Sequence, residues 1–185
     1  GTRTSGGYAF SYLDIDLATP HDDEGLHNNS FINIENITIT THNVRDDDNT
    51  ILKASALIEG DGGDNHIISG HGDDLIFGGG GDDRIFGGAG DDLIYGGEGH
   101  DRLYAGWHGG TLYGEAGEDR LVGGMHADTL YGGEGHDRLD GHSGDDILYG
   151  GAGDDRMWGG RGDDRLYGGA GDDRMWGGRG DDILE

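Results

Sequence analysis

Aspartate recurs every nine residues, with few exceptions, through the second part of this 185-residue chain, each time behind a short run of glycines. The segments Gly87–Tyr95 (GGAGDDLIY), Gly96–Tyr104 (GGEGHDRLY) and Gly168–Trp176 (GGAGDDRMW) show the pattern. Carboxylates and backbone carbonyls are hard oxygen ligands, and Ca²⁺ takes about six to eight of them. Glycine tolerates the positive φ that turns carbonyls inward, and aspartate is short enough to reach an ion held in such a loop. The spacing predicts a series of calcium sites, because tight turns alone would not require the whole pattern every nine residues.

The elements that position these loops follow from the same repeat. Residues 60–185 divide without insertion into fourteen consecutive units of the form G-G-x-G-x-D-x-U-x, where U is apolar. Position eight is apolar in every unit, which predicts the core, and its flanking residues point outward because side chains alternate along a strand. The position-eight residues are Ile67, Ile76, Ile85, Ile94, Leu103, Leu112, Leu121, Leu130, Leu139, Leu148, Met157, Leu166, Met175 and Leu184.

These units resemble the calcium-binding β-roll of RTX proteins, which leave bacteria by type I secretion. The resemblance implies an all-β fold, a right-handed parallel β-roll (a β-solenoid) in which two nonapeptides, each a loop and a short strand, form one 18-residue turn. Ca²⁺ is then expected in the loops on both edges, between loops two units apart. We call the odd-numbered units the odd sheet and odd edge, and the even-numbered units the even sheet and even edge.

The resemblance also implies the ligands of each ion. They are carbonyls from positions one and three of one loop, carbonyls from positions two and four of its neighbour, and both position-six side chains. The expected side-chain ligands are Asn65, Asp74, Asp83, Asp92, Asp101, Asp119, Asp128, Asp137, Asp146, Asp155, Asp164, Asp173 and Asp182. The expected carbonyl ligands are Gly78, Gly79, Gly80, Gly81, Gly87, Gly88, Ala89, Gly90, Gly96, Gly97, Glu98, Gly99, Gly132, Gly133, Glu134, Gly135, Gly150, Gly151, Ala152, Gly153, Gly159, Gly160, Arg161, Gly162, Gly168, Gly169, Ala170 and Gly171.

A few loops depart from the pattern. Fourteen loops paired in this way allow twelve intervening sites. Gly110 supplies no side chain at position six and His108 replaces the fourth glycine, so the two sites that share this loop are expected to be empty or completed by water. Asn65 weakens the first site of the odd edge, and Glu115 at position two offers its carbonyl with some strain. His126 occupies position four of the next even loop. The prediction is about ten Ca²⁺ ions.

The two outer faces are expected to differ. Position seven of the odd sheet is arginine in six units, Arg84, Arg102, Arg120, Arg138, Arg156 and Arg174. Position nine of the even sheet is aromatic at Phe77, Tyr95, Tyr113, Tyr131, Tyr149 and Tyr167. The arginines either relieve the acidic charge, with cation–π contacts to Trp158 and Trp176, or form a track for an acidic polysaccharide. The aromatic column either stiffens the sheet by stacking or forms an interface for self-association.

Residues 1–59 precede the repeats and differ from them in composition. Ala9–Leu17 (AFSYLDIDL) and Phe31–Thr41 (FINIENITITT) alternate apolar and polar residues, which predicts strands. A polar loop is expected over 19–30, and Thr50–Ile58 runs into the first repeat. We interpret residues 1–59 as irregular solenoid turns that cap the open end of the stack, as terminal units of solenoids do.

The chain has a formal net charge of −26, with 43 Gly and no Cys. Such a composition is typical of disorder unless something neutralises the carboxylates. Metal binding is therefore expected to contribute to the free energy of folding, with the chain unfolded in a low-Ca²⁺ cytosol and folded after export. The acidity argues against nucleic acid and anionic membrane surfaces as partners. No apolar run approaches the roughly 18 residues that a membrane span requires.

No catalytic pattern accompanies the repeats. The sequence contains no His-Glu-x-x-His, Gly141–Gly144 lacks the Gly-x-Ser-x-Gly of a nucleophile elbow, and His100 and His136 are expected to be solvated loop residues. We therefore predict no enzyme but a calcium-dependent module that stabilises or presents part of a larger secreted bacterial protein, in contact with the type I secretion machinery through that parent. The alternative is a carbohydrate- or surface-binding module.

Overall fold

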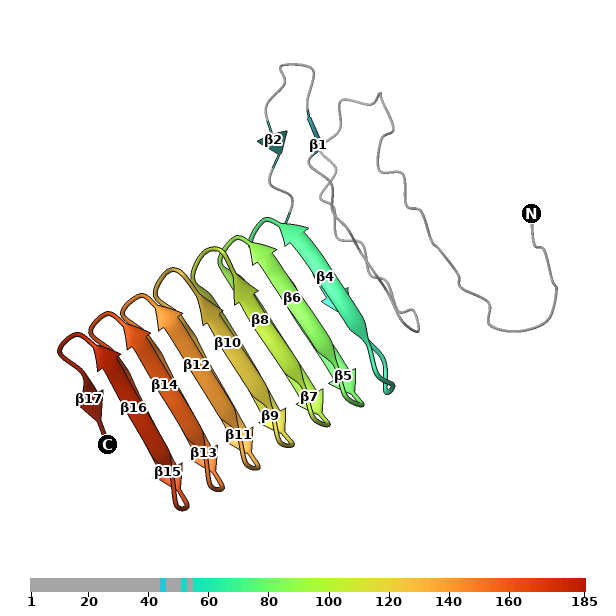
Figure 1. The fold of residues 1–185 in the computed structure, drawn as a ribbon. Helices are drawn as coiled ribbons and strands as arrows, with labels where there is room; N and C mark the ends of the chain where they lie inside the picture. Colours follow the sequence, from blue (N-terminus) through green and yellow to red (C-terminus); the bar gives the residue numbers. More distant parts are fainter. Residues whose placement is uncertain (1–43, 46–50, 53–54) are drawn as a thin grey trace, which may run out of the picture.

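The computed structural model describes residues 44–45, 51–52 and 55–185, and these form strands, turns and loops without a helix. Figure 1 shows parallel strands stacked in a row from β4 to β17. No helix among the described residues is long and apolar enough to cross a membrane. The strands predicted at 9–17 and 31–41 and the loop predicted at 19–30 lie outside the described residues.

Two parallel sheets form the stack, and the chain crosses from one to the other after every strand. The odd sheet has seven strands: β4 (His66–His71), β6 (Arg84–Ala89), β8 (Arg102–Gly106), β10 (Arg120–Gly124), β12 (Arg138–Ser143), β14 (Arg156–Arg161) and β16 (Arg174–Arg179). The even sheet has eight: β3 (Leu57–Glu59), β5 (Leu75–Gly80), β7 (Asp92–Glu98), β9 (Gly110–Ala116), β11 (Thr129–Glu134), β13 (Ile147–Ala152), β15 (Arg165–Ala170) and β17 (Ile183–Leu184).

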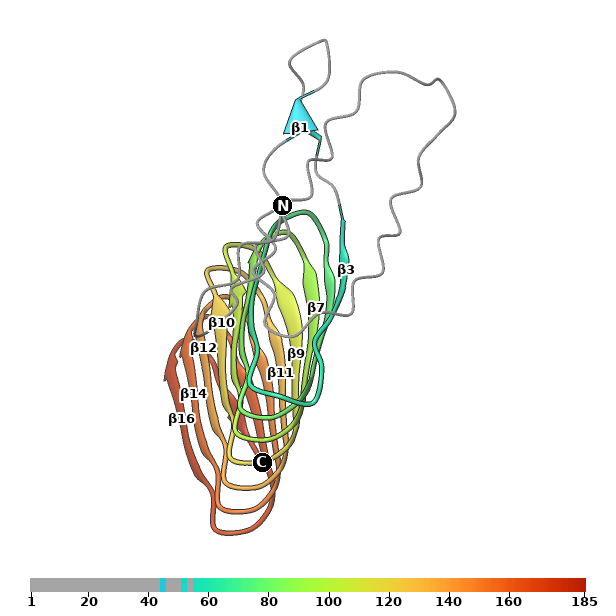
Figure 2. The ribbon, with the colours of Figure 1, turned by 90° about the vertical axis from the view of Figure 1, so that its right-hand side faces the viewer.

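The register of both sheets is set by the nonapeptide. Leu103 pairs with Leu121 in the odd sheet and Tyr113 with Tyr131 in the even sheet, so each residue faces the same position of the repeat one turn later. Two units therefore form one turn, and Figure 2 shows the successive turns nested behind one another. The prediction of an all-β parallel β-roll is confirmed.

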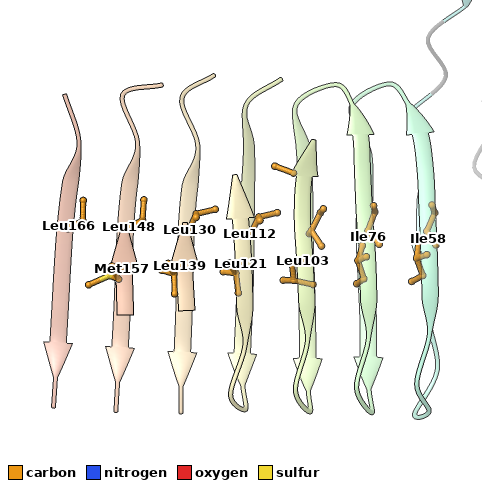
Figure 3. Close-up of a cluster of buried hydrophobic side chains, with 14 residues drawn as sticks. Ile58, Ile76, Leu103, Leu112, Leu121, Leu130, Leu139, Leu148, Met157 and Leu166 are labelled. Carbon is orange, nitrogen blue, oxygen red and sulfur yellow. The ribbon is translucent and has the colours of Figure 1, made fainter. Parts of the chain in front are cut away.

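The core is a narrow row of aliphatic side chains between the sheets (Figure 3). Position eight is buried from Ile67 through Leu166, at 0–1% exposure, and Met175 packs partly against this row. Leu184 departs from the prediction because it is 44% exposed. It lies on β17, the terminal strand of its sheet among the described residues.

The stack also extends one strand before residue 60. Strand β3 pairs in parallel with β5, and its Ile58 is 1% exposed in the same core row. Further toward the N-terminus, β1 (Val44–Arg45) and β2 (Ile51–Leu52) pair with each other in an antiparallel sheet of two strands.

The outward faces carry the side chains that the alternation predicts. On the even sheet, successive aromatic rings from Phe77 to Tyr167 stack with centroids 4.6–4.9 Å apart and interplanar angles of 1–11°. On the odd sheet, the guanidinium of Arg138 lies 4.6 Å from the ring centroid of Trp158, and that of Arg84 lies 5.0 Å from Phe86. Ring stacking and cation–π contacts therefore both stabilise the outer faces.

Candidate metal centre

The position-six aspartates are held by a ladder of hydrogen bonds along each edge. Asp119 Oδ1 accepts a hydrogen bond of 2.8 Å from the backbone N–H of Asp101, eighteen residues earlier. The N–H of Asp119 donates in turn to Asp137 Oδ1 at 2.8 Å. All twelve predicted aspartate ligands accept this bond through Oδ1, namely Asp74, Asp83, Asp92, Asp101, Asp119, Asp128, Asp137, Asp146, Asp155, Asp164, Asp173 and Asp182.

The second carboxylate oxygen has no such partner in most loops. Oδ2 is buried and without a hydrogen bond in Asp74, Asp83, Asp92, Asp101, Asp119, Asp137, Asp146, Asp155 and Asp164. A buried polar atom without a partner costs free energy, and a charged one costs more. The loops therefore leave one carboxylate oxygen each for a ligand that the protein itself does not supply.

Glycine at position one makes room for this oxygen. A Cβ added to Gly78 would collide with Asp83 Oδ2 of the same loop and come within 2.5 Å of the carbonyl oxygen of Gly96, one turn later. The Oδ2 atom without a hydrogen-bond partner and the position-one carbonyl oxygen of the next loop therefore both lie close to Gly78, between the two loops. The structure brings together, between two stacked loops, a side chain and a carbonyl that the sequence assigned to one site.

Carbonyls of the earlier loop also face the space between the loops that begin at Gly78 and Gly96. A Cβ on Gly97, whose φ is +116°, would strike the carbonyl oxygen of Gly79, and a Cβ on Gly99 would strike that of Gly81. Positions two and four therefore direct their carbonyls toward the next loop, whereas position one directs its carbonyl toward the previous one. Carbonyl oxygens of both loops therefore face the space between them.

The predicted position-three carbonyls are partly engaged. The carbonyl oxygens of Ala89 and Ala152 accept hydrogen bonds of 2.8 Å from the N–H groups of Gly72 and Gly135. Glu134, Arg161 and Ala170 accept equivalent bonds. A carbonyl oxygen has two lone pairs, so these groups keep one for a further ligand.

Two non-glycine residues adopt the left-handed conformation that position two requires. Glu115 has φ +75° and His142 has φ +73°. Such a backbone is strained for an L-residue with a Cβ, so the strain predicted for Glu115 is confirmed. His142 has the same strain, which was not predicted. Its place at position two of its unit would have indicated the left-handed conformation.

The electrostatics of the metal-free loops disfavour ionised carboxylates. Burial raises the pKa of Asp92, Asp119 and Asp146 to about 7, an effect that the backbone N–H bond opposes and neighbouring carboxylates reinforce. Burial likewise raises the pKa of Asp83 and Asp137 to about 6. A divalent cation between the loops would supply the opposite charge that these carboxylates lack.

No group of three or more His, Cys, Asp or Glu side chains converges as a metal site within the described part of the chain. A cation in these loops would therefore be held by one or two carboxylates and several carbonyls. That donor set consists only of oxygen, which suits Ca²⁺ and not a soft transition metal. The residues present fit a calcium ion.

One even-edge loop lacks the arrangement altogether. Gly110 offers no carboxylate, and the preceding position one is Ala105, whose Cβ would lie 2.9 Å from a Cβ on Gly110. The methyl group of Ala105 thus takes the space that the position-six carboxylate takes in other loops. The sequence analysis did not predict that the Ala105 side chain replaces the missing carboxylate, although Ala105 and Gly110 belong to the same repeat unit.

The next even-edge loop is altered as well. Asp128 Oδ2 accepts a hydrogen bond of 2.6 Å from the N–H of Gly124, so both oxygens of this carboxylate have partners. Neither Gly124 nor His126 shows the positive φ that most other units have at positions two and four. The prediction that these two loops differ from the others agrees with their geometry.

The comparison with protein families agrees with this geometry. The family model for the RTX calcium-binding nonapeptide repeat (4 copies) matches residues 57–85, 77–107, 111–125, 122–157, 131–165 and 149–184. The matched segments leave out residues 108–110, the part of the altered loop that contains His108 and Gly110. A search of curated proteins found no match. The chain belongs to the family of RTX calcium-binding nonapeptide repeats.

Proposed function

We propose that this β-roll is the calcium-dependent folding and stabilising module of a larger secreted bacterial protein. RTX repeats are calcium-binding structural modules, and they occur in secreted bacterial proteins. The module is unfolded at low Ca²⁺ and folds after export, where it stabilises or presents a neighbouring domain. The observation that carries this proposal is the row of buried Oδ2 atoms without a hydrogen-bond partner, because a bound cation would offset the cost of burying them in ionised form.

The proposed ions follow the two edges. The odd edge has an unbroken row of position-six side chains from Asn65 to Asp173, whereas Gly110 interrupts the even edge. The two sites that share the Gly110 loop have one carboxylate each and are proposed to be empty or completed by water. Of the remaining sites, about ten in all, the one between Asp128 and Asp146 is the weakest, because the Gly124 N–H already occupies Asp128 Oδ2.

A matched pair of substitutions tests this assignment. Asp119→Asn keeps an Oδ1 acceptor for the Asp101 N–H but removes the second oxygen of the carboxylate that two adjacent proposed sites share. We expect calorimetric titration to show two fewer Ca²⁺ ions per chain. Asp128→Asn is the control, because its second oxygen serves Gly124, and it should remove one ion at most. Equal losses in the two variants, or none in Asp119→Asn, would contradict the proposed sites.

A second candidate function, binding of an acidic polysaccharide, is favoured by the arginine column of the odd sheet. Its six arginines, from Arg84 to Arg174, are exposed and face one another in register. Among the described residues no salt bridge involves an arginine. An array of guanidinium groups without carboxylate partners suits a polymer of regularly spaced carboxylates.

Retention of the Ca²⁺-bound protein on an immobilised polyuronate tests this candidate. Replacing Arg120 and Arg138 by Gln is expected to abolish retention, because both lie in the middle of the column. Replacing Arg165, which lies on the even sheet, should leave retention unchanged. Passage of the unaltered protein without retention would leave cation–π stacking and charge relief as the role of the column.

A further inference from the structure

The altered loops of the even edge bring two histidines together. His108 and His126 replace the position-four glycine in consecutive even units, eighteen residues apart. Their imidazole rings stack with centroids 5.6 Å apart and an interplanar angle of 20°. Both side chains are exposed, so two imidazole rings, which are nitrogen donors, stand side by side at the surface of this edge.

The second ring is oriented for coordination. His126 Nδ1 lies 2.9 Å from the backbone carbonyl oxygen of Trp107. A carbonyl only accepts hydrogen bonds, so Nδ1 carries the proton and the lone pair is on Nε2. Metal-ligating histidines typically donate their other ring N–H to a carbonyl or carboxylate, which fixes the tautomer and the ring. The Trp107 carbonyl fulfils that role for His126.

A cavity of about 570 Å³ adjoins both rings, lined also by Asp91, Gly109 and Gly110. Gly109 lacks the side chain that every other unit carries at position five, so this volume is left open. Asp91 Oδ1 lies 4.0 Å from the position of a Cβ on Gly109, close to His108 in the chain. A carboxylate thus borders the same cavity as the two imidazoles.

The Asp91 carboxylate differs from its equivalents in other loops. Asp73 and Asp145, also at position five, accept a hydrogen bond from the backbone N–H one turn later. No backbone N–H among the described residues donates to the Asp91 carboxylate, because the next turn of the ladder begins at the altered loop. Its oxygens are therefore free for a ligand in the cavity.

The chemistry of these donors differs from that of the calcium loops. Imidazole suits Zn²⁺, Ni²⁺ and Cu²⁺, whereas Ca²⁺ prefers oxygen. Gly110 provides no carboxylate, and both oxygens of Asp128 accept backbone N–H groups. The same substitutions that remove calcium ligands from this edge therefore supply ligands for a different class of ion.

We propose that His108 and His126 bind one divalent transition-metal ion, with Zn²⁺ as its representative, and that water completes the coordination beside the exposed Asp91 carboxylate. Tetrahedral Zn²⁺ with Zn–N bonds of about 2.0–2.1 Å separates two ligand nitrogens by about 3.3 Å. Stacked rings at the observed spacing reach this separation when their Nε2 edges tilt toward each other, and the exposed position of both side chains permits that tilt. The site is independent of the calcium loops and present once per chain.

Zinc titration of the Ca²⁺-saturated protein tests the proposal. Saturating Ca²⁺ occupies the oxygen sites, so calorimetry is expected to show one Zn²⁺ per chain. His108→Gly combined with His126→Gly restores the glycine of the repeat and should weaken Zn²⁺ binding by at least ~100-fold, since loss of an outer partner alone costs about 10–100-fold. His100→Asp combined with His136→Asp is the matched control, because it also removes two loop histidines and restores the commoner residue, and it should bind Zn²⁺ unchanged.

Further readouts make the result unambiguous. Co²⁺ in place of Zn²⁺ should give the visible absorption of a four-coordinate site in the unaltered protein and not in the double glycine variant. Far-UV circular dichroism in Ca²⁺ confirms that each variant is folded, and His126→Gln replaces the double variant if that one is not. Zn²⁺ binding that survives loss of both histidines, or that disappears equally in the His100/His136 control, would overturn the proposal.

Discussion

Removal of Ca²⁺ at neutral pH is expected to unfold the solenoid completely. The reason lies in the loops, where nine buried Oδ2 atoms have no hydrogen-bond partner and position-six carboxylates follow one another along both edges. The chain as a whole has a net charge of −26. Without cations, the folded state brings these charges together out of water, whereas the unfolded chain keeps them apart and hydrated.

Far-UV circular dichroism measures this directly. Protein treated with a chelating resin should show the spectrum of a disordered chain at pH 7.5, and addition of Ca²⁺ should restore the β spectrum. Mg²⁺ should not replace Ca²⁺, because it retains its water and demands a stricter geometry. A β spectrum that persists in the Ca²⁺-free protein at neutral pH would refute the coupling of folding to calcium.

The same prediction has a pH control. In the metal-free protein burial raises the pKa of Asp92, Asp119 and Asp146 to about 7, above the ordinary value of 3.8. A raised pKa means that the folded state binds more protons, so its stability falls as the pH rises from about 4 to about 7. The Ca²⁺-free protein is therefore expected to recover β structure near pH 4, and an unchanged disordered spectrum from pH 7.5 to pH 4 would argue against burial of these carboxylates.

Restoration of the altered even-edge loop is expected to add two Ca²⁺ ions per chain. The triple substitution Ala105→Gly, His108→Gly and Gly110→Asp gives this unit the residues of its neighbours at positions one, four and six. The new carboxylate would complete the sites on either side of the loop, and its Oδ1 would accept the N–H of Asp92. Calorimetric titration should show the two additional ions and a lower Ca²⁺ midpoint for folding.

The single substitution Gly110→Asp is the informative control. A Cβ at this position lies 2.9 Å from the Cβ of Ala105, which is 1% exposed in the core. The carboxylate therefore has no room until Ala105 becomes glycine, and the single variant should bind no additional ion and be less stable. Two added ions in the single variant would show that the Ala105–Gly110 exchange does not control the site.

The period of the sequence was enough to predict most of the fold. Apolar residues at position eight lead to one buried row because two units form each turn, so that Leu103 and Leu121 fall in register. The position-six aspartates were predicted for the same reason. Leu184 was assigned to the core by its place at position eight, whereas its exposure reflects the place of β17 at the end of its sheet.

The details of the loops could not be predicted from periodicity. Which oxygen of Asp119 serves the backbone and which stays free depends on how the loops stack. The bond from Gly124 to Asp128 arises only because this loop abandons the usual backbone conformation. The spacing of His108 and His126 did contain a signal, since eighteen residues is one turn, but each histidine was considered as a defect in its own loop.

The two ladders of aspartate hydrogen bonds differ in continuity, and this difference has a consequence for how the backbone is protected from solvent. Along the odd edge, consecutive turns from Asn65 to Asp173 are joined by an aspartate bond. Along the even edge the series stops between Asp92 and Gly110, because glycine has no carboxylate to accept the Asp92 N–H. At that step the backbone pairing of β7 with β9, from Asp92 to Ala116, holds the even edge without help from an aspartate side chain. We therefore expect the Asp92 N–H to exchange with solvent faster than the equivalent N–H groups of the other turns.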